Sequence, residues 1–312
     1  MKKILITGSV GQIGSELALN LRNRFGNQNV VAGGHKTEPS EELRESGPFE
    51  IVDCTDINAI DGVVKKYQID TVFHLASLLS AVAENNPQLA WNVNVNSLVN
   101  ILEVARESKC AVFMPSSIGA FGPTTPLDNT PQVTVQRPTS IYGVTKVSAE
   151  LLCDYYYHKY DVDVRGLRYP GIISYVTPPG GGTTDYAVEI FYQALKEKKY
   201  TCFLKEGTRL DMMYMPDAIK GAIDLMEADP AKLINRNAYN VSAMSFAPED
   251  IFAEIKKFIP ELTMDYEIDP LRQGIADSWP NYMNDSAARE EWGWQPEYDL
   301  PLMVKDMLKN LA

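Results

Sequence analysis

The stretch KKILITGSVGQIGSEL, residues 2–17, decides the fold of this 312-residue chain. Its apolar beginning predicts a short buried strand over residues 2–7. An amphipathic helix is predicted over residues 13–25, where apolar side chains recur on one face. Three glycines at G-x-x-G-x-x-G spacing join the strand to the helix: Gly8, Gly11 and Gly14.

A glycine turn between a first strand and a first helix is typical of a dinucleotide-binding site. The first glycine allows the tight turn, the second lets backbone approach a pyrophosphate, and the third lets the helix pack on the strand. The helix N-terminus offers free N–H groups to the anion. We therefore expect the turn to hold a dinucleotide through Gly8, Gly11, Gln12, Ile13 and Gly14.

The first half of the chain repeats this alternation of strand and helix. Further strands are predicted over residues 30–32, 49–52, 71–76, 110–114 and 163–169, and further helices over 56–66, 88–108 and 141–158. Nearly apolar strands that alternate with helices indicate a parallel sheet covered on both faces. The predicted fold class is α/β, a Rossmann-type doubly wound parallel sheet with a smaller C-terminal substrate lobe.

The pattern changes after Pro170. A loop rich in Pro, Gly and Thr spans residues 177–186, and the later elements are fewer and less regular: helices near 186–198, 216–228, 248–258 and 300–311, and strands near 200–204 and 263–267. We predict an NAD-binding domain over 1–170. Residues 171–312 mainly form a substrate-binding lobe that closes over the sheet, with some segments returning to the sheet.

Composition excludes several classes of function. The 29 Lys and Arg against 41 Asp and Glu give a net charge of −12, which argues against nucleic acid or an anionic membrane as partner. No apolar run approaches the ~20 residues of a membrane span. The four cysteines are widely spaced, which favours a reduced, cytoplasmic protein. Neither they nor the three histidines show metal-ligand spacing, so no metal site is expected.

The end of the second predicted strand departs from the usual dinucleotide pattern. NAD-binding sites usually place Asp or Glu there, against the adenosine ribose, but this chain has Gly33 and Gly34 followed by His35 and Lys36. NAD can still bind through its other contacts, yet NADP is not excluded. Asp53, after the third strand, is placed to hydrogen-bond the adenine amino group. Leu75 and Ala76 follow the fourth strand, where the cofactor would cross.

Candidate catalytic groups follow the fifth strand. Tyr142 and Lys146 stand four residues apart in a predicted helix, so they share one face. The lysine charge favours the phenolate, which can act as general base toward a substrate hydroxyl. Ser116 and Ser117, at the carboxyl end of the strand, could hydrogen-bond the substrate oxygen.

Four motifs together resemble the extended short-chain dehydrogenase/reductase superfamily: GxxGxxG, PSSxxxFG, YGxxK and LRYPG. Narrower segments are similar to the short-chain L-threonine 3-dehydrogenase family. They are LLSAVAE (78–84), PSSIGAFGPTTP (115–126), PPGGGTTDYAVEIFY (178–192), MMYMPDAI (212–219) and ADSWP (276–280). The resemblance covers nearly the whole chain.

That resemblance implies a role for each matching residue. Tyr142 would be the acid/base, Lys146 its partner, and Ser117, five residues before Gly122, the hydroxyl that orients the substrate. Substrate contacts would come from Ser80, Gly182, Thr183, Thr184 and Trp279. Asn94 or Asn96 would touch the cofactor, and Ile172 would line the nicotinamide site. The implied reaction is NAD-dependent, metal-free oxidation of L-threonine at C3 to L-2-amino-3-oxobutanoate, a step of threonine catabolism.

Two other functions stay open at this point. A sugar-nucleotide epimerase or dehydratase shares the glycine turn and the Tyr/Lys pair, whereas a non-catalytic dinucleotide sensor needs no Ser/Tyr/Lys set. The apolar stripe Val144, Val147, Leu151, Leu152 and Tyr155 could pack on the sheet or, with helix 88–108, form a dimer interface. The resemblance favours a homodimer.

Overall fold

The computed structural model describes residues 1–311, so the last residue of the predicted C-terminal lobe, 312, lies outside the described part. The chain divides into two compact units. Unit 1 comprises residues 1–120, 140–168 and 219–239, and unit 2 comprises residues 121–139, 169–218 and 240–312. Each unit is described by itself.

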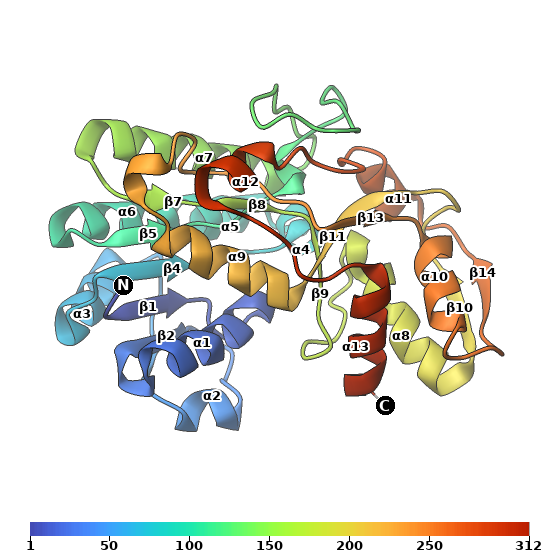
Figure 1. Ribbon diagram of the computed structural model, residues 1–312. Helices are drawn as coiled ribbons and strands as arrows, with labels where there is room; N and C mark the ends of the chain where they lie inside the picture. Colours follow the sequence, from blue (N-terminus) through green and yellow to red (C-terminus); the bar gives the residue numbers. More distant parts are fainter. Residues whose placement is uncertain (312) are drawn as a thin grey trace. The chain divides into compact units, whose positions relative to one another are not determined.

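A six-stranded parallel sheet forms the centre of unit 1 (Figure 1). Its strand order is β3-β2-β1-β4-β5-β7. The strands are β1 (Ile4–Thr7), β2 (Val30–Gly34), β3 (Phe49–Ile51), β4 (Thr71–His74), β5 (Ala111–Phe113) and β7 (Val164–Arg165). The order reverses at β1 and β4, as in a doubly wound sheet. The predicted fold class is therefore confirmed.

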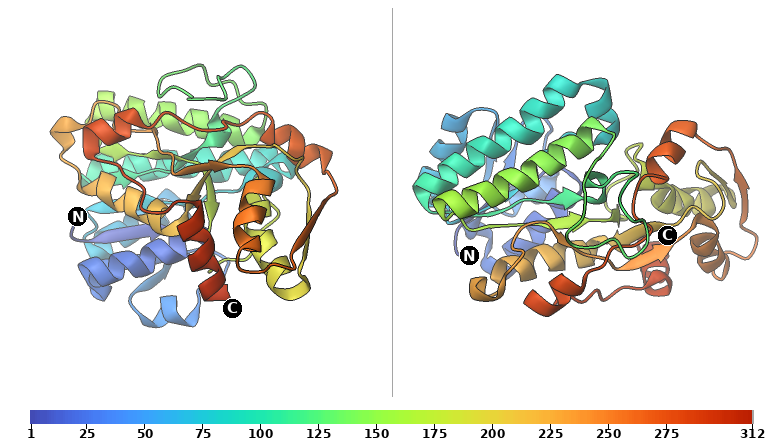
Figure 2. Two further views of the ribbon diagram at one scale, coloured as in Figure 1. Left: turned by 45° about the vertical axis from the view of Figure 1, so that its right-hand side comes forward. Right: turned by 90° about the horizontal axis from the view of Figure 1, so that it is seen from above.

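Helices cover both faces of this sheet. They are α1 (Gln12–Phe25), α2 (Glu41–Glu45), α3 (Ile57–Tyr67), α4 (Ser80–Asn85), α5 (Pro87–Trp91), α6 (Ser97–Ser108) and α7 (Ile141–Tyr160), and the last part of α9 (Met215–Glu227) joins them. Seen from above, α6 and α7 lie side by side on one face and α9 lies on the other (Figure 2). Asp56 caps α3 and Ser140 caps α7, each accepting a hydrogen bond from a backbone N–H of the first turn.

The core of unit 1 lies between the sheet and the helices α3, α6 and α7. Strand residues such as Leu5, Val72 and Val112 pack there against helix residues such as Leu98 and Cys153, all at most 2% exposed. Burial of this apolar surface stabilises the sheet at about 25 cal/mol per Å². The carboxyl ends of the strands, where the candidate residues stand, are thereby fixed to the packed helices.

Two predicted elements differ in detail from the structure. The predicted helix over 88–108 contains a π-helical turn, η2 (Asn92–Asn96), between α5 and α6. The predicted strand over 163–169 is two strands, β7 and β8 (Leu167–Tyr169), because the chain changes sheets at Gly166. A side chain at Gly166 would lie 2.4 Å from the Met114 carbonyl oxygen, so only glycine allows this bend. The helices α2 and α4 were not predicted.

Short elements complete unit 1, the last of them, β12, at the point where the chain passes into unit 2. They are the 3-10 turns η1 (Asn27–Asn29), η3 (Ile118–Ala120) and η5 (Pro230–Lys232), and the strands β6 (Ser116–Ser117) and β12 (Tyr239–Asn240). Strand β8 lies between β12 and β6 in a separate three-stranded sheet.

Unit 2 contains two small sheets and the remaining helices. Strands β9 (Gly171–Ile173), β11 (Leu210–Tyr214) and β13 (Met244–Phe246) pair in the order β13-β11-β9, and β10 (Lys199–Cys202) pairs with β14 (Thr263–Tyr266). The helical elements are η4 (Thr183–Asp185), α8 (Tyr186–Glu197), the start of α9, α10 (Pro248–Lys256), α11 (Pro270–Ala276), α12 (Ser286–Trp292) and α13 (Leu300–Leu311). Helices α11 and α12 and several of the short strands were not predicted.

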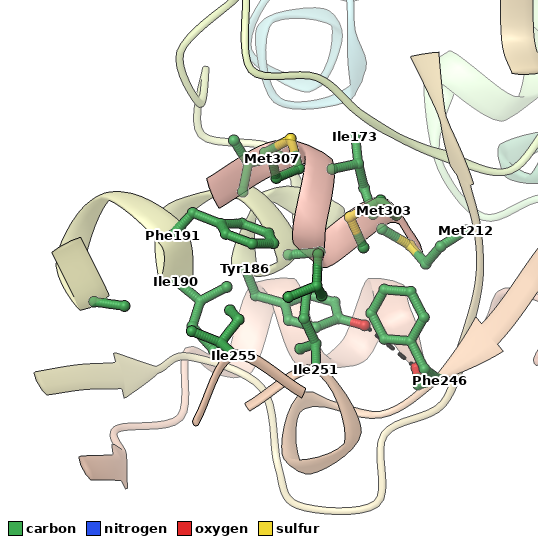
Figure 3. Close-up of a cluster of buried hydrophobic side chains, with 14 of the residues drawn as sticks. Ile173, Tyr186, Ile190, Phe191, Met212, Phe246, Ile251, Ile255, Met303 and Met307 are labelled. Carbon is green, nitrogen blue, oxygen red and sulfur yellow. Dashed lines mark hydrogen bonds between the residues drawn. The ribbon is translucent and has the colours of Figure 1, made fainter. Parts of the chain in front are cut away.

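Unit 2 has its own apolar core. Figure 3 shows the ring of Tyr186 among apolar side chains from α8, α10 and α13, with its hydroxyl directed to the carbonyl oxygen of Phe246 at 3.3 Å. Burial, with smaller contributions from nearby acidic groups, raises the pKa of Tyr186 well above its ordinary value, so this phenol is a structural group. No described helix in either unit combines the length and the apolar character that crossing a membrane requires.

Candidate functional site

Two glycines of the turn in unit 1 are packed closely against backbone atoms. Gly8 has φ +72°, and a side chain there would lie 2.6 Å from the amide nitrogen of Ala76. A side chain on Gly14 would lie 2.2 Å from the carbonyl oxygen of Gly8. Leu75 donates its N–H to the Thr7 carbonyl at 3.0 Å, which brings the segment after β4 to the turn. Both positions therefore admit only glycine.

This turn fits a dinucleotide pyrophosphate. Helix α1 starts after Gly11 and has no acidic residue in its first turn, so its free N–H groups and the positive end of its dipole face the space above the turn. Gln12 and Ile13 are the first residues of that helix. A Cβ on Gly11 would lie 3.3 Å from the Gly8 carbonyl oxygen, at the place where a dinucleotide pyrophosphate needs uncovered backbone.

The two serines after β5 face different partners. Ser116 is buried and donates its hydroxyl to Glu150 on α7. Glu150 also pairs with Arg168, at 3.0 Å and 2.8 Å, inside unit 1. Ser117 instead accepts the N–H of Gly119 at 3.1 Å and is only half-buried. The prediction preferred Ser117 over Ser116, and only Ser117 has a hydroxyl that is not committed to a buried carboxylate.

Ser117 and Tyr142 flank the same point at the carboxyl edge of the sheet. A side chain on Gly119 would lie 3.1 Å from Cε1 of Tyr142 and 3.5 Å from Oγ of Ser117. Gly119 therefore lets the tyrosine ring and the serine hydroxyl approach each other. Sequence reasoning assigned no role to Gly119, although it lies within the quoted segment PSSIGAFGP.

Lys146 is held one helical turn from Tyr142. Its ammonium donates to the Pro115 carbonyl at 2.8 Å and lies 5.5 Å from the centre of the Tyr142 ring. The side chain is 8% exposed, so its charge acts in a poorly solvated region. A negative charge on the Tyr142 oxygen would be stabilised there. The contact with Pro115 was not predicted.

Asn94 belongs to a buried hydrogen-bond network beside α7. Its side-chain oxygen accepts from Leu78 N at 2.7 Å, and its amide nitrogen donates to the Leu78 carbonyl and to Thr145 Oγ1, both at 3.1 Å. Thr145 in turn donates to the Tyr142 carbonyl at 2.7 Å. Asn96 is exposed and donates its side-chain amide to Asn92. Of these two candidates, Asn94 is therefore the one fixed to the Tyr142 helix.

His74 is a buried, neutral group that links elements next to the site. Its two ring nitrogens lie 2.8 Å from Thr7 Oγ1 and 3.1 Å from Ser97 Oγ. Burial, with a smaller contribution from the Lys146 charge, lowers the pKa of His74 to about 3. The ring therefore stays uncharged near neutral pH and ties β1 and β4 to α6.

Asp53 and Ser80 lie at other places of the same edge. Asp53 accepts from the side chain and the backbone N–H of Thr55, at 2.7 Å and 2.9 Å, and these bonds lower its pKa. Ser80 begins α4, which packs on α7, and Glu84 of α4 accepts from Ile141 N at 2.7 Å. Contact of Asp53 with adenine and of Ser80 with substrate stays a prediction.

Unit 2 brings together most of its own predicted residues. Helical turn η4, which holds Thr183 and Thr184, packs against β9, which holds Ile172, and against α11. Gly182 and Gly181 donate to Asp185 at 2.7 Å each, which fixes the turn. Trp279 follows α11 and is half-buried against the unit 2 core. Thr183 is 3% exposed, so its hydroxyl is the least accessible of the group.

The cavities and charged clusters elsewhere point to no competing centre. A cavity of about 390 Å³ lies at the amino ends of β4, β5 and β7, opposite the candidate site, and contains none of the predicted residues. Among residues 1–311, no three His, Cys, Asp or Glu side chains are grouped so as to hold a metal ion. All four cysteines are buried free thiols.

Comparison with known proteins gives consistent relatives over the whole chain. The model of the "NAD dependent epimerase/dehydratase family" matches residues 4–242. An uncharacterized epimerase/dehydratase of Staphylococcus saprophyticus is 55% identical over 308 residues, covering 99% of this chain and 96% of the relative.

Two solved structures resemble the fold closely. The L-threonine dehydrogenase of Clostridium difficile is 58% identical, with a TM-score of 0.98 over 100% of this chain and 98% of its own. The holo form of a GalE-like L-threonine dehydrogenase from Cupriavidus necator is 50% identical, with a TM-score of 0.96 over 99% and 100%. The similarity extends through both units.

Proposed function

Since the chain belongs to the NAD dependent epimerase/dehydratase family, we propose that it is an NAD-dependent L-threonine 3-dehydrogenase that oxidises L-threonine at C3 to L-2-amino-3-oxobutanoate. Among the family's activities, this one is supported by the solved relatives, which are themselves named L-threonine dehydrogenases. The curated relative carries only the broader description.

The arrangement of Ser117, Tyr142 and Lys146 carries the proposal. All three lie at the carboxyl edge of the sheet whose first turn is open for a pyrophosphate. Ser117 donates its hydroxyl to the C3 oxygen of the substrate. The Tyr142 phenolate takes the proton of the substrate's C3 hydroxyl. Lys146 stabilises the phenolate and offers a donor to the nicotinamide ribose. A bound nicotinamide ring supplies the acceptor for the hydride that leaves C3.

The remaining residues are assigned by their place in each unit. Gly8, Gly11, Gln12, Ile13 and Gly14 would hold the pyrophosphate, Asp53 the adenine, and Leu75, Ala76, Asn94 and Ile172 the rest of the dinucleotide. Ser80, Gly182, Thr183, Thr184 and Trp279 would hold the amino acid. In this proposal residues 1–170 supply the core of the cofactor domain, and residues 171–312 mainly form the substrate-binding lobe, with some segments returning to the cofactor domain.

Replacing Tyr142 with Phe tests the assignment. The ring keeps its packing against Gly119, but the general base is lost, so kcat for NADH formation with L-threonine should fall about 10²–10⁴-fold. NADH binding, followed by its fluorescence, should change less than about threefold. Full activity of Tyr142→Phe would refute the catalytic assignment. Turnover of a UDP-sugar in place of L-threonine would identify an epimerase instead.

We further propose a cytoplasmic homodimer. Helix α7 turns Gly143, Thr145, Lys146 and Ala149 inward, while Val144, Leu151 and Tyr155 are 39%, 63% and 51% exposed. Of the predicted stripe, Leu152 packs against the unit 1 core, whereas these three side chains are exposed. Helices α4 and α5 pack against α7. Exposed apolar side chains on them and on the residue before α4 extend the apolar surface: Leu79, Val82, Leu89 and Trp91. Exposed apolar patches of this kind mark interaction sites.

The dimer is tested by charge insertion. Leu151→Glu places a charge at the centre of the exposed stripe and should convert a dimer to a monomer in light scattering after size exclusion. Lys159→Glu, on the exposed end of the same helix, is the matched control and should keep the dimer. A wild-type chain that is monomeric at tens of micromolar would contradict the proposal.

A further inference from the structure

In a dinucleotide-binding sheet, the adenosine ribose binds at the end of β2. In NAD sites an Asp or Glu about 20 residues after the glycine turn hydrogen-bonds the ribose hydroxyls. In this chain that place is taken by Gly34, the last residue of β2. A carboxylate there would bond the ribose hydroxyls and repel a 2′-phosphate, and neither effect is available from glycine.

Packing keeps position 34 free of a side chain. A Cβ on Gly34 would lie 2.7 Å from Cζ of Phe49 and 3.4 Å from Cγ1 of Val10. Phe49 stands on β3, which pairs in parallel with β2, so its ring covers the place that a ribose-reading carboxylate would use. The missing acid is therefore part of the β2–β3 packing and could not be restored without moving Phe49.

Two basic residues come directly after Gly34 in the sequence, His35 and Lys36. His35 is 48% exposed along its side chain, and Lys36 is exposed. The facing acid is Asp53, whose Oδ2 lies 3.6 Å from His35 Nε2, while its Oδ1 is held by Thr55. Glu38 is paired with Arg44 at 2.6 Å. Two basic groups against one engaged carboxylate make this corner favourable for an added anion.

We propose that this corner accepts the 2′-phosphate of NADP(H), with Lys36 and His35 as its ligands, so that the chain binds NADP(H) alongside NAD(H). The inference rests on the proposed dinucleotide site and extends it from NAD to both cofactors. Lysine and histidine give charge-assisted hydrogen bonds to phosphate but lack the planar fork of arginine. The two cofactors should therefore bind within about tenfold of each other.

Fluorescence titration of the purified full chain with NADH and NADPH tests this without any turnover. The double variant His35→Ala/Lys36→Ala should weaken NADPH about tenfold and NADH less than about threefold, because only NADPH loses phosphate contacts. Raising the salt concentration should weaken NADPH more than NADH, since the corner is exposed. Lys232→Ala, at an exposed lysine of unit 1, is the charge-matched control and should change neither.

A second variant restores the carboxylate in place of removing the basic residues. Gly34→Asp combined with Phe49→Ala makes room for a carboxylate at the end of β2 and should selectively weaken NADPH, by about tenfold or more. If this variant does not fold, the His35/Lys36 comparison still decides.

The outcomes separate the two proposals. NADPH binding more than about 100-fold weaker than NADH, or equal losses of both cofactors in the His35/Lys36 variant, would overturn the inference and leave the proposed function standing. Failure of both cofactors to bind would overturn the proposed function itself, and the inference with it.

Discussion

The proposed catalytic end and the proposed adenosine end of unit 1 lie at the carboxyl edge of one sheet, but different contacts hold them. At the catalytic end, Lys146 is 8% exposed, and the Glu150–Arg168 pair behind Ser116 is 4% and 8% exposed. At the adenosine end, His35 and Asp53 are 48% and 41% exposed and 3.6 Å apart. Electrostatic interactions are strong where water is excluded and weak where it is not, so we expect charges at the first end to contribute more to stability than charges at the second.

The largest effect is expected from breaking the buried pair. Glu150→Gln leaves the Arg168 guanidinium and the Ser116 hydroxyl without their carboxylate, and should lower the free energy of unfolding by about 3–5 kcal/mol. Glu38→Gln, which breaks the exposed pair with Arg44, is the matched control and should have little effect. Chemical denaturation measures both. Similar losses in the two variants would remove the distinction between buried and exposed ends.

An intermediate effect is expected from pH, through His74. The folded-state pKa of about 3 lies below the unfolded value of about 6.5, so the unfolded chain takes up the proton first. Stability should therefore fall as the pH drops below about 6.5 and continue to fall toward 3. The His74 contribution is about 2 kcal/mol between pH 8 and pH 5.

Denaturation curves of wild type and His74→Asn over that range isolate the contribution. The variant should be less stable at pH 8, because it loses contacts to Thr7 or Ser97, but its stability should depend less on pH. Parallel pH curves for the two proteins would show that His74 is not the titrating group.

The smallest effect is expected at the adenosine end. Asp53→Asn removes the negative charge that faces His35 but keeps an oxygen that can accept a hydrogen bond. NADPH affinity should rise by about threefold, with a smaller change for NADH, because the pair is exposed and screened. The two Kd values from fluorescence titration test this. A tenfold loss of both cofactors would instead indicate that the Asp53 charge itself is needed for adenine.

Helix α7 shows how far sequence reasoning reached. The spacing of Tyr142 and Lys146 correctly predicts one shared helical face, because the helical period is a local property of the chain. The same helical periodicity identified the apolar stripe but not the surroundings of the stripe in the fold. Whether Val144, Leu151 and Tyr155 face a sheet or solvent depends on the position of α7 on the sheet, which no local pattern encodes.

The two adjacent serines after β5 show a similar limit of prediction from sequence. Ser116 and Ser117 look equivalent in sequence, and a preference for Ser117 came only from its spacing to Gly122. The structure distinguishes them physically, since Ser116 is bonded to Glu150, 34 residues further along the chain. In the same way, the turn η2 that directs Asn94 toward Thr145 interrupts what reads as one uniform helix.

The sequence by itself therefore determined the parallel sheet, the glycine turn and the Tyr/Lys pair, because each follows from backbone geometry over fewer than about 20 residues. Only the tertiary structure decided which serine is bonded to a buried carboxylate and why Gly119 must be small. It also decided that the Phe49 ring leaves no room for a carboxylate at position 34. Those properties arise from close packing between segments that are distant in sequence. Close packing is also the reason that a single added carbon at Gly34 or Gly119 would have to move a neighbour.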